Sequence, residues 1–289
     1  MNIWGRKLKI LEIMTMKTKV TEEIRREAVT DEYGVVYSRD GEWLISALGC
    51  TTLEYWMKEG TKYVADAAFY NSLITVLHQP ESLVGIGMDV YGFSYIEELN
   101  LPKNLRYIPK VNPFAHCHSV KRVRCESEWF VVEKGLLYSR DREVLYGAVT
   151  NEFPEKVILE EPLKIIVNGA FNDRMQLKEV VLPDSVEELG KGSFFGSSLE
   201  QIRLSANIKE IPTECFASCK LREVVIPEGV ERIDDGAFSG NRLLSHPKLP
   251  KSLKHKSRDC FEECNVTQIT QIAQKGSLRS NRIGVRKCS

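Results

Sequence analysis

The stretch "LREVVIPEGVERIDDGAF" at residues 221–238 decides the fold, because near-copies of it recur along most of the 289-residue chain. It has the pattern L-x-x-V-x-I-P-x-x-V-x-x-I-x-x-x-A-F. The closing aromatic residue recurs at nearly constant intervals, apart from one longer interval before Phe171, at Phe69, Tyr91, Phe114, Phe171, Phe194, Phe216, Phe238 and Phe261. A period of about 22–23 residues predicts a solenoid of stacked repeats.

Each part of the repeat has a physical role. The L-x-x-V-x-L segment predicts a short strand, and a following proline ends it because proline cannot donate to a sheet ladder. One unit buries six apolar side chains at about 1.5–3 kcal/mol each. Ordering its backbone costs about 1–2 kcal/mol per residue, so a single unit cannot fold alone. Stacking shares the buried faces between neighbours. We expect the aromatic ring to fill the space between successive coils, next to a small residue at Ala68, Ala170, Ser193, Cys215, Ala237 and Cys260.

The repeat at 221–238 resembles the BspA-like, Treponema pallidum-type class of bacterial leucine-rich repeats. The resemblance covers roughly residues 53–272. It implies a β-rich leucine-rich-repeat solenoid of short parallel strands, with about 22–23 residues per coil. Proteins of this class are mostly non-catalytic binders, and many are displayed on bacterial surfaces and used in adhesion.

Two alternating segments interrupt the repeat. "DEYGVVYSRDGEWLISAL" at 31–48 and "EWFVVEKGLLYSRDREVLYGAV" at 128–149 each predict a β-hairpin around a Ser-Arg-Asp turn. We expect the first to cap the solenoid and the second to be inserted in it. The predicted segments are a polar helical or disordered segment at 1–30, the cap at 31–52, a first repeat block at 53–127, the inserted hairpin at 128–153, a second block at 154–272 and a basic disordered tail at 273–289.

Composition restricts the function classes. Lysine plus arginine and aspartate plus glutamate number 40 each, so no net field attracts nucleic acid or an anionic membrane. No apolar stretch approaches the roughly 20 residues of a membrane-spanning helix. The N-terminal apolar run is broken by Lys7, Lys9 and Glu12, which argues against a signal peptide. Translation could start at Met1, Met14 or Met16. We expect a cytoplasmic protein by default, with the cell surface or secretion as the alternative that the resemblance implies.

Two groups of potential metal ligands compete with simpler interpretations. Cys215, Cys219, Cys260 and Cys264 occupy repeat positions, where we expect buried small side chains and not a zinc site. His116, Cys117 and His118 form a stronger mixture of ligands, with Cys125 nearby in sequence. No carboxylate that could orient them is evident. The prediction is therefore no metal and no cofactor, with a metal-binding protein centred on these three residues kept as an alternative.

The exposed strand face is the candidate binding surface. In L-x-x-V-x-L the third and fifth positions point outward and stack into two rows along the sheet. No nucleophile arrangement or phosphate-binding loop stands out, so we predict that the chain is not an enzyme. The predicted partner-binding residues are Glu98, Asn100, Arg122, Arg124, Glu179, Gln201, Arg203 and Glu223.

These observations lead to one functional hypothesis and one rival. The hypothesis is a monomeric, non-catalytic module that binds a protein partner, since its mixed charges do not form the continuous basic stripe that nucleic acid requires. The rival is a cell-surface adhesin for a host matrix protein or glycan.

Overall fold

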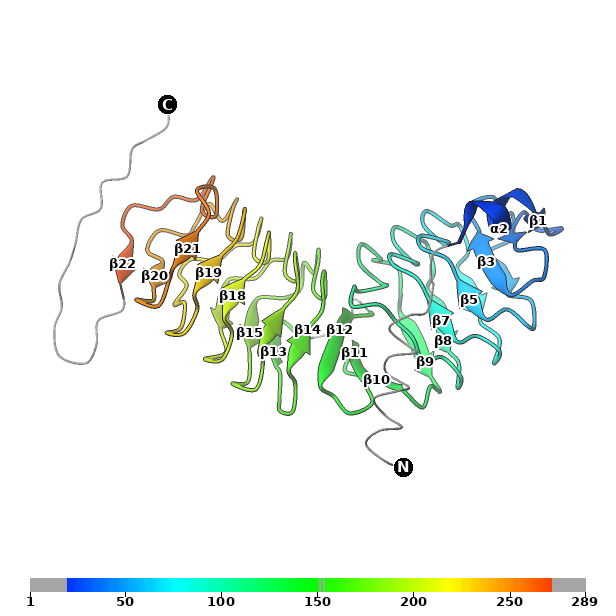
Figure 1. The fold of residues 1–289 in the computed structure, drawn as a ribbon, viewed down its shortest axis with the longest axis horizontal. Helices are drawn as coiled ribbons and strands as arrows, with labels where there is room; N and C mark the ends of the chain where they lie inside the picture. The colour runs from blue at the N-terminus through cyan, green and yellow to red at the C-terminus, as the bar shows by residue number, and fades with distance from the viewer. Residues whose placement is uncertain (1–19, 151, 153, 272–289) are drawn as a thin grey trace. The chain divides into compact units, whose positions relative to one another are not determined.

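The repeat folds into coils, most of which contribute two short strands. The structure, a computed structural model, describes residues 20–150, 152 and 154–271 (Figure 1). Within this range the chain divides into two compact units. The first unit comprises residues 20–109 and 116–132, and the second comprises 110–115 and 133–271.

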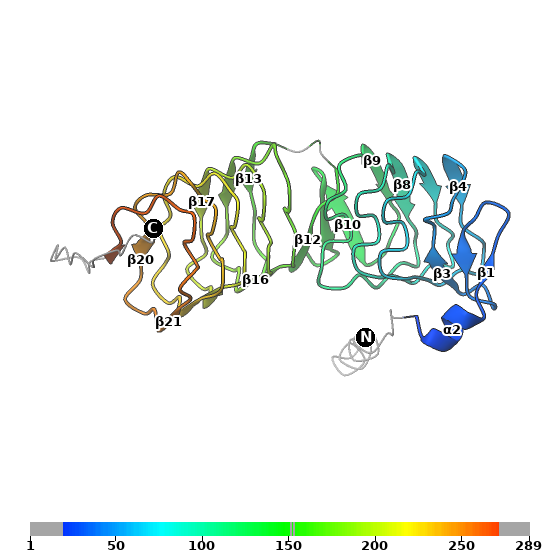
Figure 2. The same ribbon diagram turned by 90° about the horizontal axis from the view of Figure 1, so that it is seen from above.

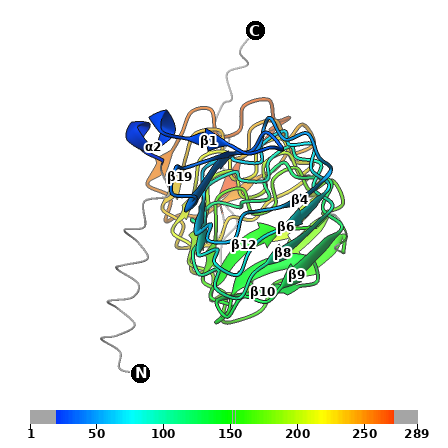
Figure 3. The ribbon, with the colours of Figure 1, turned by 90° about the vertical axis from the view of Figure 1, so that its right-hand side faces the viewer.

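The L-x-x-V-x-L segments of the first unit form a four-stranded parallel sheet. Its strands are β4 (Glu54–Trp56), β6 (Val76–His78), β8 (Glu98–Leu101) and β9 (Arg122–Cys125). Each pairs in register with the strand one coil away. Viewed along this unit, the four strands lie side by side (Figure 3). We call this sheet the strand face of the first unit.

The V-x-x-I segments form a second parallel stack on the other side of the coils (Figure 2). In the first unit it contains β5 (Tyr63–Val64) and β7 (Gly85–Ile86). The stack begins with the predicted N-terminal hairpin, β2 (Val36–Tyr37) and β3 (Trp43–Ser46), which pair antiparallel. Because β3 also pairs parallel with β5, the hairpin supplies the first strand of the stack.

Residues before the hairpin also have regular structure. Helix α2 (Glu22–Arg26) is polar, and the Thr21 hydroxyl accepts a hydrogen bond from the backbone N–H of Ile24. Strand β1 (Val29–Thr30) pairs antiparallel with β2. This strand lies just before residue 31, where we placed the start of the cap. Residues 1–19, including the three candidate start sites, lie outside the described residues.

The second unit repeats this arrangement. One side of its coils carries the parallel strands β13 (Lys156–Ile158), β15 (Glu179–Val181) and β17 (Gln201–Arg203). Later on the chain, β20 (Lys248–Leu249) pairs parallel with β22 (Thr270–Gln271), so the second repeat block continues to residue 271. The V-x-x-I strands are β14 (Ile165–Ile166), β16 (Glu188–Leu189), β18 (Glu210–Ile211), β19 (Arg232–Ile233) and β21 (His255–Lys256).

The inserted hairpin is part of the second unit's stack. Its strands β11 (Leu136–Ser139) and β12 (Val144–Ala148) pair antiparallel, as the sequence predicts. Strand β12 pairs parallel with β14, so this hairpin also supplies the first strand of a stack. Strand β10 (Phe130–Glu133) precedes it and contains the boundary between the units.

The aromatic residues form the predicted stack in the core. In the second unit the rings of Phe171, Phe194, Phe216, Phe238 and Phe261 lie one above the other, with successive centroids 5.1–5.3 Å apart. In the first unit Phe69 stacks on Tyr91 at 6.0 Å. The small residues before the rings are buried, which explains their size. One ring per coil therefore fills the interior of each unit.

Two further predictions concern the C-terminal tail and membrane-spanning helices. The tail at 273–289, expected to be disordered, lies outside the described residues. In the part of the chain that the structure describes, no helix is both long and apolar enough to cross a bilayer.

Candidate binding surface

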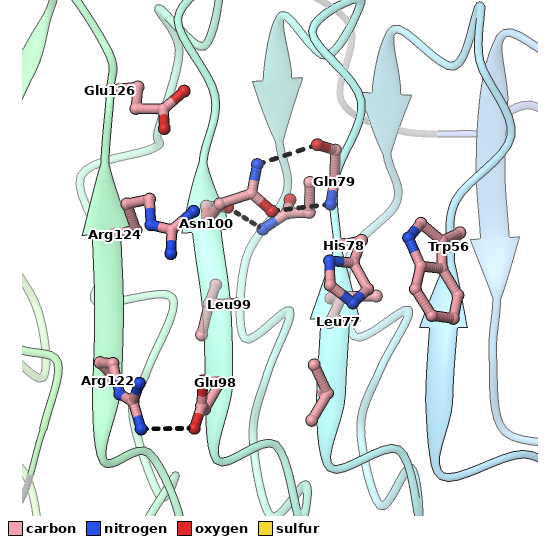
Figure 4. Close-up of a pocket in the computed structure, with 11 residues that line it drawn as sticks. Trp56, Leu77, His78, Gln79, Glu98, Leu99, Asn100, Arg122, Arg124 and Glu126 are labelled. Carbon is pink, nitrogen blue, oxygen red and sulfur yellow. Dashed lines mark hydrogen bonds and ion pairs between the residues drawn. The ribbon is translucent and has the colours of Figure 1, made fainter.

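Two outward-facing rows run across the strand face of the first unit. Residues that pair across neighbouring strands share a row. The first row is Glu54, Val76, Glu98 and Arg122, and the second is Trp56, His78, Asn100 and Arg124. Four of the eight predicted partner-binding residues, Glu98, Asn100, Arg122 and Arg124, therefore lie together on one sheet. They line a shallow hollow of about 330 Å³ (Figure 4).

Trp56 forms one end of the second row. Its indole is 60% exposed and lies flat on the imidazole of His78, with centroids 4.3 Å apart and planes 9° apart. His78 is itself oriented by Glu54, whose Oε1 lies 2.9 Å from Nε2. The stack presents the large apolar face of the indole to solvent in a defined orientation.

Asn100 is held by the neighbouring coil. Its Oδ1 accepts a hydrogen bond from the backbone N–H of Gln79 at 2.8 Å, and its Nδ2 donates to the Gln79 carbonyl at 2.9 Å. The Gln79 side chain in turn donates to the Asn100 carbonyl at 2.7 Å and accepts from the buried hydroxyl of Tyr91. The Asn100 amide thus extends the ladder between coils beyond the strands.

The two arginines on β9 have different surroundings. Arg122 forms an ion pair with Glu98, with 2.8 Å between nitrogen and oxygen. No ion pair among the described residues involves Arg124, which is exposed. Figure 4 shows Arg124 and Glu126 at the edge of the hollow, on the side away from Trp56. Arg124 is therefore the cation of this hollow that is not neutralised by a salt bridge.

The other four predicted residues lie on the second unit. Glu179 pairs in register with Gln201 and forms an ion pair with Lys156 at 2.8 Å. Arg203 donates to the carbonyl of Leu182 and to both carboxylate oxygens of Asp184. Gln201 and Glu223 are exposed. Like Asn100, Arg203 is tied to the preceding coil.

The sequence reasoning missed Trp56. Its coil departs from the repeat pattern, with Thr52 and Tyr55 where the next coil has Ile74 and Leu77. Counting one repeat period backward from His78 would have found it. The strand register places Trp56 directly beside His78.

The cysteines and histidines do not form a metal site among the described residues, where no group of three or more His, Cys, Asp or Glu side chains could hold an ion. Cys215, Cys219 and Cys260 are buried, as predicted for small core residues, whereas Cys264 is only partly buried. Burial raises the pKa of the Cys219 thiol to about 12 and that of Cys260 to about 11. The imidazole of His116 stacks on Phe93, with ring planes 7° apart.

Comparisons with known proteins agree with this geometry. Residues 49–141 and 155–281 match six copies of a repeat described as the BspA type leucine rich repeat region. No curated protein matches the chain.

Several solved bacterial structures have a similar fold. A leucine rich cell surface protein from Faecalibacterium prausnitzii is 24% identical, with a TM-score of 0.69 over 76% of this chain and 60% of that one. A leucine-rich repeat protein from Eubacterium ventriosum is 14% identical, with a TM-score of 0.59 over 80% of this chain and 81% of that one. The pneumococcal vaccine antigen PcpA is 18% identical, with a TM-score of 0.59 over 87% of this chain and 73% of that one. The chain thus spans 60% of the length of the Faecalibacterium protein.

Proposed function

The chain belongs to the BspA-type leucine-rich repeat family, and from this premise we propose that it is a non-catalytic module that binds a protein partner on the strand face of its first unit. The observation that carries the proposal is the second outward row of that sheet. Its two end members, Trp56 and Arg124, are exposed, whereas the two between them are held by neighbouring coils.

The distance between Trp56 and Arg124 limits the kind of partner that can contact both. Three strand spacings of about 4.8 Å separate β4 from β9, so the indole and the guanidinium are about 14 Å apart along the row. Tryptophan and arginine are the residue types most enriched among the side chains that dominate binding energy. A complementary partner presents an apolar or aromatic side chain to Trp56 and a carboxylate to Arg124.

The remaining predicted residues have supporting roles in this proposal. The Arg122–Glu98 pair borders the contact, and Asn100 keeps the coils in register beneath it. Glu179, Gln201, Arg203 and Glu223 provide a second contact area on the second unit. Because every coil adds one row, a repeat surface can use several such areas for one large partner.

Affinity capture with full-length protein tests the proposal. Immobilised wild-type chain selects peptides from a random displayed library, and the selected peptides are then measured against Trp56→Ala and Arg124→Glu. The control is Arg106→Glu, which makes the same charge change at an exposed position of the first unit, next to the β5–β7 stack. We expect each of the two test variants to weaken binding about tenfold or more and the control to leave it unchanged.

The proposal also predicts which residue types the selected peptides contain. They should combine an acidic residue with an aromatic or large apolar one. Peptides that bind both test variants as tightly as the wild type, or that lose binding only with Arg106→Glu, would show that the contact lies elsewhere.

A second candidate function is an adhesin at a bacterial surface. It is supported by the description of the similar Faecalibacterium protein as a cell surface protein and of PcpA as a vaccine antigen. Labelling of intact cells of the native host with an antibody against the chain tests it. Signal from intact cells is expected, and signal only after lysis would exclude this role.

A further inference from the structure

One backbone position in the repeat has a left-handed conformation in coil after coil. It lies two residues after the core aromatic, and φ there is between 51° and 72° at Asn71, Phe93, His116, Asp173, Gly196, Ser218, Gly240 and Glu263. Glycine, asparagine and aspartate adopt this conformation at least cost, and a bulky side chain there is unusual. Phe93 and His116 are therefore exceptions, and they occupy consecutive coils.

The side chains at these two positions form an exposed aromatic edge. Phe93 stacks on His116 with centroids 4.9 Å apart, and Tyr70 meets Phe93 edge-on at 5.3 Å. Phe93 and Tyr70 are 45% and 38% exposed as whole residues. A Cβ at Gly92 would lie 3.1 Å from the Tyr70 ring, so this glycine leaves room for it. We call Tyr70, Phe93 and His116 the aromatic edge.

The stretch of sequence that includes Tyr70 and Phe93 has acidic side chains but neither lysine nor arginine. Between Lys62 and Lys103 the chain has no lysine or arginine, but it has the carboxylates of Asp66, Glu81, Asp89, Glu97 and Glu98. Glu97 and Glu98 form ion pairs with Lys121 and Arg122. Asp89 lies in the same turn as Phe93 and, among the described residues, takes part in no ion pair.

Asp89 begins the turn that leads to Phe93, because its carbonyl accepts a hydrogen bond from the backbone N–H of Gly92 at 3.2 Å. Burial raises the pKa of its carboxyl, while the nearby His116 lowers it and Asp66 raises it. The Asp66 side chain is oriented by the backbone N–H of Met88, which donates to its Oδ1 at 2.8 Å. The exposed carboxylate of Asp89 therefore lies in the same turn as Phe93, with the His116 side chain nearby.

We propose that the aromatic edge binds an arginine or lysine side chain from a basic segment of a protein partner. The cation lies against the exposed rings of Tyr70 and Phe93 and pairs with Asp89. A cation is attracted to a ring face by its quadrupole, and arginine also stacks on aromatic rings through its planar guanidinium. The carboxylate of Asp89 favours a cationic side chain over an acidic or neutral one. This contact uses turn residues and does not require the proposed strand-face function.

Binding of defined peptides to the full chain tests the proposal. The probe is a fluorescent peptide with four Gly-Arg repeats, and its control has citrulline in place of each arginine, which keeps the shape but removes the charge. We expect the arginine peptide to bind at least fivefold more tightly at low salt. Equal affinity for the two peptides would overturn the proposal.

Variants separate the aromatic edge from other surfaces. Phe93→Asn introduces the residue that the preceding coil has at Asn71, so the fold and the thermal midpoint should be retained. We expect Phe93→Asn and Asp89→Asn each to weaken arginine-peptide binding about two- to fivefold, and Phe93→Tyr to retain it. Ser218→Asn, at the same repeat position in the second unit, is the matched control and should change nothing.

The same measurement distinguishes this site from the strand face. Trp56→Ala should leave the affinity for the arginine peptide unchanged. Binding that is insensitive to Phe93→Asn, or that falls equally with Trp56→Ala, would overturn the assignment to the aromatic edge.

Discussion

The indole of Trp56 lies flat on the imidazole of His78. The carboxylate of Glu54, which is on the same strand as Trp56, contacts that imidazole as well. The two rings come from equivalent positions of consecutive coils. The strand face thus holds its most exposed aromatic side chain through contacts between coils.

Replacing His78 by alanine should free the Trp56 side chain without unfolding the sheet. Both side chains are partly exposed, so we expect a loss of about 0.5–1 kcal/mol in the free energy of unfolding. In the protein labelled with fluorotryptophan, the ¹⁹F resonance of Trp56 should narrow and shift toward the value of the free amino acid. Trp56→Phe identifies the resonance, and an unchanged signal would show that the stacking does not restrict the indole.

Removing one core ring should destabilise the second unit strongly. Phe194→Ala leaves a cavity between Phe171 and Phe216, and we expect a loss of about 3–5 kcal/mol in the free energy of unfolding by urea. Met175→Ala is the control, because that side chain is 60% exposed and should cost at most about 0.5 kcal/mol. A similarly small loss of unfolding free energy for both variants would mean that the stacked rings do not stabilise the core.

Alkaline pH should weaken the start of the first unit through Tyr37. This buried hydroxyl lies 2.6 Å from that of Tyr55, which donates to Asp31, and burial raises the Tyr37 pKa from 10.0 to about 12. The folded state therefore keeps a proton that the unfolded chain loses above pH 10. The contribution is complete below pH 10 and is lost between pH 10 and about 12, by about 2–3 kcal/mol.

Urea unfolding at several pH values measures this effect. Between pH 10 and 12 the decline should be shallower for Tyr37→Phe than for the wild type, even though the variant starts from a lower stability after losing its hydrogen bonds. Parallel declines would assign the alkaline sensitivity to other groups, such as Tyr138, whose pKa burial also raises to about 12.

Two nearby glycines, Gly85 and Gly87, should respond differently to alanine. A Cβ at Gly87 would lie 2.4–2.9 Å from atoms of Asp66 and Ala65 in the preceding coil. A Cβ at Gly85 would make ordinary contacts of 3.4 Å or more with tyrosine side chains. We expect Gly87→Ala to lower the urea midpoint by the equivalent of about 1–3 kcal/mol and Gly85→Ala to have a much smaller effect. Equal effects would contradict the close approach of the coils at Gly87.

Much of the scaffold could be predicted from residue spacing. The regular interval between the aromatic residues from Phe171 to Phe261 predicted the coil length, the ring stack and the parallel strands. Both hairpins were predicted from alternation around a Ser-Arg-Asp turn. The pairing of each hairpin with the repeats was not predicted, because alternation shows that two strands pair with each other but not that β3 and β12 also pair with the first V-x-x-I strand.

The rows of the candidate site could be predicted from the sequence, but the hydrogen bonds and ion pairs of each side chain could not. Spacing placed Asn100 and Arg124 at the same repeat position, and the strand register confirms that they are neighbours. Only the structure shows that the Asn100 amide is bonded to the backbone of Gln79, whereas Arg124 forms no ion pair among the described residues.

By itself the sequence determined which residues face inward and how often the chain turns, because burying one aromatic ring per coil imposes a period that is visible in the residue order. The tertiary structure alone decided which outward side chains remain available to a partner. Each of these side chains either faces solvent or contacts a group on the neighbouring coil. Which of the two occurs depends on the distance and direction between the coils. Trp56, Arg124 and Phe93 differ from their neighbours in this respect, although nothing in their spacing sets them apart.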